Sequence, residues 1–180
     1  NFQSVPVTVI GISFALAAFP ALSAAAAAGD RGAFGRILGR NLASLTLLTV
    51  LAAVALFLLS RFAIEVLLGG EQFTAEQVDR TVAVLAAFTL AIPFESITHL
   101  LSRAIYATRN TLLQVLASLA AFAITIGVAN ALAPSMGLIA VPLGFAIGQA
   151  AKVALLALAL VPRIRSIRPG EAREELLEGR

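Results

Sequence analysis

Long apolar segments without charge alternate with short polar segments along this chain. No charged side chain occurs in residues 1–29, 41–60 or 110–151. Because an α-helix rises about 1.5 Å per residue, about 20 apolar residues cross a hydrocarbon core of roughly 30 Å. Segment 41–60 has that length by itself, and it lacks the polar face that a helix of a soluble bundle needs. The pattern therefore predicts an all-α polytopic membrane protein.

Five transmembrane helices account for these apolar segments. The charge-free stretch 110–151 is too long for one crossing, and it is expected to divide at residues 133–137, where Pro134 and Gly137 interrupt the pattern. The five spans are expected at about residues 4–25, 41–60, 82–107, 111–132 and 138–161. They belong to one transmembrane part, residues 1–162, and residues 163–180 are expected to form a charged cytoplasmic tail.

Polar residues between the spans predict three further local structures. Residues 31–40 place apolar side chains on one side and arginines on the other, as in a short helix that lies at the level of the lipid headgroups. Residues 61–68 are too short to cross and carry charge, so they are expected at the membrane interface. Thr74 and Gln77 have the spacing of a capping box, which predicts a helix start before the third span.

The arginines predict the orientation of the chain in the membrane. Alternate connections belong to opposite sides, and one side then receives ten arginines: Arg31, Arg36, Arg40, Arg103, Arg109, Arg163, Arg165, Arg168, Arg173 and Arg180. The other side receives only two: Arg61 and Arg80. Cytoplasmic loops carry the excess of basic residues in membrane proteins. The N-terminus is therefore expected outside and the C-terminal tail in the cytoplasm.

Composition excludes several other functions. The chain has no cysteine and one histidine, which excludes disulfides, thiolate chemistry and a metal site built from several histidines. The formal charge of +3 comes from arginines between the spans, which membrane topology explains without nucleic acid. The spacings Gly35–Gly39 and Gly144–Gly148 are typical of close helix contacts, not of a phosphate-binding loop. We therefore expect no enzyme activity, no cofactor, no metal and no nucleic-acid partner.

Ionisable and amide side chains inside the spans are the candidate cavity-lining or substrate-binding residues. Glu95, His99 and Arg103 recur every four residues, which places them on one face of a helix. Gln149 and Lys152 are three residues apart and share a face of the last span. Glu95 and Lys152 lie at similar distances from the cytoplasmic ends of their helices, so an ion pair between them is geometrically possible.

Three interpretations account for these residues, because a charge inside a membrane costs several kcal/mol unless it faces a partner or water. In the first, the charges pair with one another and hold the helices together. In the second, they line a charged cavity on a transport path. In the third, which concerns mainly Arg103, the side chain extends to the cytoplasmic surface of the membrane.

Four stretches together resemble one known family. They are VPVTVIGISFALAAFPALSAAAAAGD (5–30), LLGGEQFTAEQVDRT (67–81), LLSRAIYATRNT (100–111) and GLIAVPLGFAIGQ (137–149). Their order and spacing resemble the MurJ/MviN family of lipid II flippases, part of the superfamily of multidrug, oligosaccharidyl-lipid and polysaccharide exporters. Ile105 stands where the family usually has Phe.

The resemblance implies a function and a larger protein of which this chain is a part. It implies part of the second lobe of a two-lobed flippase that moves lipid II across the bacterial cytoplasmic (inner) membrane by alternating access. Lipid II is the undecaprenyl-pyrophosphate sugar-peptide precursor of peptidoglycan, and the missing N-terminal lobe and membrane lipids are the other implied partners. Asn1 aligns with a family arginine of the cavity, and His99 falls where relatives often carry a basic residue.

Two other functions fit the same resemblance. One is export of another lipid-linked oligosaccharide or polysaccharide. The other is a transport-inactive membrane scaffold of the same fold. An arginine cluster in the first lobe would favour a flippase over a scaffold.

Overall fold

All regular structure in the described residues, 4–68 and 74–167 of the computed structural model, is helical. The elements are α1 (Ser4–Pro6), the π-helix η1 (Val7–Ile12), α2 (Ser13–Ala27), α3 (Arg31–Leu68), α4 (Ala75–Thr89), α5 (Ala91–Ala107), α6 (Leu112–Met136), the 3-10 turn η2 (Gly137–Ile139) and α7 (Ala140–Ser166). Asn1, residues 69–73 and residues 168–180 of the expected tail lie outside the described residues.

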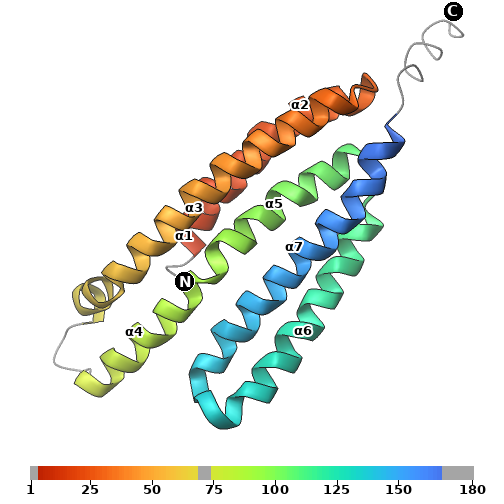
Figure 1. Cartoon of the computed structure of the whole chain (residues 1–180). Helices are drawn as coiled ribbons and strands as arrows, with labels where there is room; N and C mark the ends of the chain where they lie inside the picture. Colours follow the sequence, from red (N-terminus) through yellow and green to blue (C-terminus); the bar gives the residue numbers. More distant parts are fainter. Residues whose placement is uncertain (1–3, 69–73, 168–180) are drawn as a thin grey trace, which may run out of the picture.

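Four helical runs are long and apolar enough to cross a membrane: Ser4–Ala27, Arg31–Val66, Ala75–Ala107 and Leu112–Ser166. The last run, of 55 residues, reverses its direction at Gly137, so that α6 and α7 lie antiparallel (Figure 1). With 25 and 27 residues, α6 and α7 are each long enough for one crossing. The expected all-α membrane fold is confirmed, and the division of the last run gives five segments that are long enough to cross a membrane.

α3 differs from the prediction, which divided this region into three pieces. The structure has one continuous helix of 38 residues, so the separate headgroup-level helix expected over residues 31–40 is wrong. The change from basic to apolar side chains does not interrupt a backbone that contains no proline. Asp30 Oδ1 accepts a hydrogen bond from Ala33 N (2.7 Å) at the start of this helix, and Asn41 Nδ2 donates back to Ile37 O (2.8 Å) within it.

The third transmembrane segment is divided into α4 and α5. The predicted capping box is present at its start, where Gln77 N donates to Thr74 Oγ1 (3.3 Å) and Thr74 N donates to Gln77 Oε1 (3.0 Å). α4 ends at Thr89, and a turn at Leu90 separates it from α5. Pro93 is the third residue of α5, and a proline cannot donate the hydrogen bond that would join the two helices into one.

α5 is the central helix of the bundle. It lies between the α2–α3 pair and α7, whereas α6 packs mainly on α7 (Figure 1). Its fully buried side chains include Ile92, Ser96, Leu100, Ala104 and Ile105. The π-helix η1 packs on α5, with Gly11 against Ser96. The apolar pattern of the sequence does not reveal that this segment is a π-helix.

Glycine spacing predicts one of two expected helix contacts. A Cβ atom at Gly144 would lie 2.7 Å from Thr125 O and 2.9 Å from Ala129 N, so α6 and α7 approach closely there and the predicted contact is confirmed. At Gly35 and Gly39, none of the described atoms lies within 4 Å of such a Cβ. The contact expected from that spacing is wrong for the described part of the chain.

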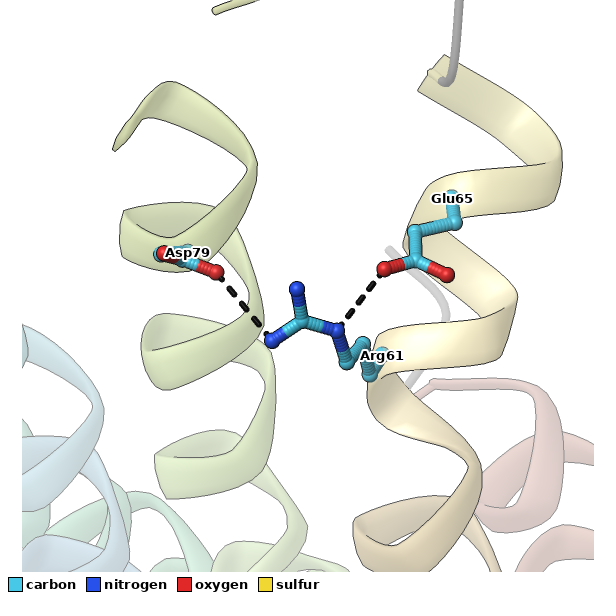
Figure 2. A network of polar contacts seen from close by, with 3 residues as sticks. All are labelled: Arg61, Glu65 and Asp79. Atoms are coloured by element: carbon cyan, nitrogen blue, oxygen red, sulfur yellow. Dashed lines mark hydrogen bonds and ion pairs between the residues drawn. The ribbon is translucent and has the colours of Figure 1, made fainter. Parts of the chain in front are cut away.

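An ion-pair network joins the far end of α3 to the start of α4 (Figure 2). Arg61 Nε lies 2.7 Å from Glu65 Oε1 on its own helix, and Arg61 Nη1 lies 3.4 Å from Asp79 Oδ1 on α4. All three side chains are exposed, so the pairs add little stability in themselves. They do, however, neutralise Arg61 with groups of the protein.

Candidate functional site

The candidate residues on α5 and α7 lie on neighbouring helices that run in the same direction (Figure 1). Glu95, His99 and Arg103 on α5 are half-buried, as are Gln149 and Lys152 on α7. The packed side of α5 is formed by other positions, so the three ionisable residues form a separate stripe beside it. We call these five residues the polar face.

A hydrogen bond connects the two helices next to the polar face. The buried Thr98 hydroxyl donates to Gln149 Oε1 at 3.5 Å, which is a long bond between α5 and α7. It occupies the carbonyl end of the Gln149 side chain and leaves the two N–H donors of the amide available. Thr98 therefore contacts Gln149 across the two helices, which the sequence alone does not indicate.

Ser102 extends this polar contact to α6. Its hydroxyl oxygen lies 2.6 Å from Thr98 O and 2.8 Å from Gln114 Oε1. Because a hydroxyl carries one proton, both bonds form together only when the Gln114 amide turns its NH₂ group toward Ser102. Gln114 was not among the predicted residues, although a glutamine inside an apolar span is a signal that could have found it.

The charges of the polar face act on one another without direct contact. Lys152 is close enough to Glu95 and His99 to interact with both electrostatically, and Arg103 interacts with His99. Within 4 Å, however, the ion pairs in the described residues are Arg61–Glu65, Arg61–Asp79 and Arg80–Glu76. The Glu95–Lys152 ion pair that their depths allow is therefore not formed in this structure.

Arg103 has a partner within the bundle. Its guanidinium carbon lies 5.9 Å from the centre of the Phe19 ring on α2, which is within the range of a cation–π contact. The polar face on α5 and α7 thus also contacts α2, through Arg103. Phe19 comes from a distant part of the chain, so no local pattern could have assigned it to this site.

The described residues show no cluster of side chains suited to a metal ion. No group of three or more His, Cys, Asp or Glu side chains in this part of the chain could hold a metal ion.

An open cavity of about 470 Å³ lies at the end of the bundle, lined by Ala28, Gly29, Asp30, Arg31 and Ile167. There Arg31 Nη2 donates to Arg165 O (2.8 Å) and caps the end of α7, which is a structural role.

Comparison with known proteins gives one family and a matching fold. The model of the family described as "Lipid II flippase MurJ" matches residues 2–176. Among solved structures, "Lipid II flippase MurJ, inward closed conformation" matches with a TM-score of 0.76 and 24% sequence identity. The match covers 92% of this chain and 36% of that chain, so this chain spans about a third of its length. No curated protein matches the chain.

Proposed function

Because this chain belongs to the MurJ family of lipid II flippases, which are transporters and not enzymes, we propose that it forms part of one lobe of a flippase. In this proposal, the protein moves lipid II across the bacterial cytoplasmic membrane by alternating access. The chain spans about a third of the solved relative, so the facing wall of the transport path comes from the missing lobe. The ends of α2, α5 and α7 face the cytoplasm in this arrangement.

The polar face is the observation that carries this proposal. Glu95, His99 and Lys152 are half-buried, although each charge in a membrane costs several kcal/mol unless it meets a partner or water. None of the three makes an ion pair within 4 Å among the described residues. We infer that these groups face a water-filled cavity between the lobes, where a polar substrate replaces the water.

Each group of the polar face has a chemical role in this proposal. Lys152 and Arg103 contribute positive charge that attracts the pyrophosphate of lipid II, and His99 adds to it when protonated. Gln149, whose carbonyl oxygen faces Thr98, offers amide N–H donors to the sugar-peptide headgroup. Glu95 balances Lys152 electrostatically while the cavity holds no substrate.

Alanine substitution in the complete transporter tests this function. Lys152→Ala and Arg103→Ala each remove a charged contact and should slow lipid II transport by about tenfold or more. Leu158→Ala serves as the control, because this side chain lies on α7 and is 71% exposed on the apolar surface. Transport is measured in bacteria depleted of their own flippase, with the amount of folded protein checked in each variant. Normal transport by both charge variants would contradict the proposal.

A further inference from the structure

The two ends of α3 lie at the two surfaces of the membrane. No charged residue occurs on this helix between Arg40 and Arg61. At about 1.5 Å per residue, these two arginines are roughly 31 Å apart along the helix, which matches the thickness of a hydrocarbon core. Arg40 and Arg61 therefore mark two opposite layers of lipid headgroups, whichever of them is cytoplasmic.

The two ends differ in how the protein neutralises their charge. Arg61 is held by the carboxylates of Glu65 and Asp79 (Figure 2). At the other end, Arg36 and Arg40 are exposed, and neither makes an ion pair within 4 Å in the described residues. Asp30 precedes the first turn of α3, and its Oδ1, like Arg36 Nη1, lies near the position of a Cβ at Gly32. This oxygen accepts a hydrogen bond from Ala33 N and makes no ion pair with Arg36 within 4 Å. Arg36 and Arg40 thus remain available to a negative partner from outside the described chain.

The surface around these arginines has room for such a partner. Gly35 and Gly39 lie beside them, and no described atom comes within 4 Å of a Cβ placed on either glycine. The Arg36 guanidinium lies back over Gly32, with Nη1 3.2 Å from the position of a Cβ there. The guanidinium groups of this end are therefore accessible from the side of the helix at the headgroup level.

The same face of α3 becomes apolar as it enters the hydrocarbon layer. Leu47, Val54 and Leu58 follow Arg36 and Arg40 at spacings of four and seven residues, which keep them on one side of the helix. They are 62%, 50% and 71% exposed, respectively. Two cations at the headgroup level above an apolar surface match a phospholipid, which has an anionic phosphodiester above its acyl chains.

We propose that Arg36 and Arg40 bind the headgroup of an anionic phospholipid, whose acyl chains lie along the apolar face of α3 that begins at Leu47. Arginine binds phosphate oxygens through paired, charge-assisted hydrogen bonds. Each basic residue near an anionic membrane surface raises affinity by about fivefold, so two arginines give a preference of about 25-fold over a zwitterionic lipid. The Arg61 end carries no such site, because its charge is already balanced within the protein.

A tryptophan reporter tests this site, since the chain has no tryptophan of its own. Leu47→Trp places the reporter below Arg40, and Leu58→Trp places a matched reporter near Arg61. The whole chain is reconstituted into nanodiscs of phosphatidylcholine that contain either brominated phosphatidylglycerol or brominated phosphatidylcholine, whose bromines quench nearby tryptophan. The Leu47→Trp reporter should show a preference for phosphatidylglycerol of about 25-fold at low salt, and the Leu58→Trp reporter should show none.

Substitution of the two arginines tests whether the lipid preference depends on their charge. Arg36→Gln/Arg40→Gln should abolish the preference, whereas Arg36→Lys/Arg40→Lys should keep most of it. Inorganic phosphate in the buffer should not displace the lipid, because it gains nothing from the apolar surface below the arginines. Equal quenching by the two lipids at Leu47→Trp, or an unchanged preference in the glutamine variant, would overturn the proposal. Full displacement by inorganic phosphate would likewise overturn it in favour of a soluble anion.

Discussion

Two buried hydroxyl groups of α5 have partners on other helices. Thr98 and Ser102 on α5 reach Gln149 and Gln114 on the next two helices along the chain. Ser96 on the same helix differs from them, because its hydroxyl is buried and has no hydrogen-bond partner among the described residues. It lies against Gly11 of the π-helix η1, so close packing takes the place of a polar contact there.

Gly11→Ala tests this close contact. The new Cβ would lie 2.8 Å from Ser96 Oγ and 3.1 Å from Ser96 Cα, so α5 and η1 must move apart. We expect a loss of about 1–3 kcal/mol of stability, measured by thermal unfolding in detergent. Gly39→Ala is the control, because its Cβ meets no described atom and alanine favours a helix. Equal unfolding temperatures for the two variants would contradict the packing at Gly11.

Glu95 and Lys152 should be energetically coupled although they do not touch. Removing either charge leaves the other unbalanced inside the bundle, and removing both restores the balance. Glu95→Ala and Lys152→Ala should each slow transport, and the double variant should be milder than the sum of the two. A double-mutant cycle on transport rates in the complete protein should give a coupling of at least about 0.5 kcal/mol. Strict additivity would contradict the interaction.

At the scale of the helix, periodicity and capping residues predict where segments lie better than where they break. The capping box at Thr74 is read directly from residue types, whereas the break at Leu90, three residues before Pro93, divides a span expected over residues 82–107. The continuity of α3 is missed, because a change in side-chain polarity looks like a boundary although the backbone hydrogen bonds continue. The π-helix Val7–Ile12 has no composition that distinguishes it from an α-helix.

The direction of α3 through the membrane is an expectation that labelling can test. The arginine distribution places the start of α3 in the cytoplasm and the start of α4 outside. Gly35→Cys and Ala75→Cys give single reporters, since the chain has no cysteine and both positions are exposed. A membrane-impermeant thiol reagent added to intact cells should label position 75 and not position 35. The reverse pattern would show that the orientation is inverted.

At the scale of the whole molecule, the sequence predicts the members of the polar face better than their contacts. The cost of charge in a membrane is enough to select Glu95, His99 and Lys152. Gln114 and Phe19 are missed, because their contacts join helices that are separate in the sequence. The facing wall of the proposed cavity cannot be predicted from this chain, because a substrate site of this kind lies between two halves.

Water access to the polar face is the most direct test of the proposed transport cavity. Gln149→Cys and Ile147→Cys lie two residues apart on α7, at nearly the same depth, but Gln149 is on the polar face and Ile147 is 45% exposed on another side. A thiol must ionise to react, and lipid prevents ionisation. In the complete transporter, a water-soluble maleimide should label Gln149→Cys at least about tenfold faster than Ile147→Cys. Equal and negligible labelling at the two positions would contradict a water-filled cavity at the polar face.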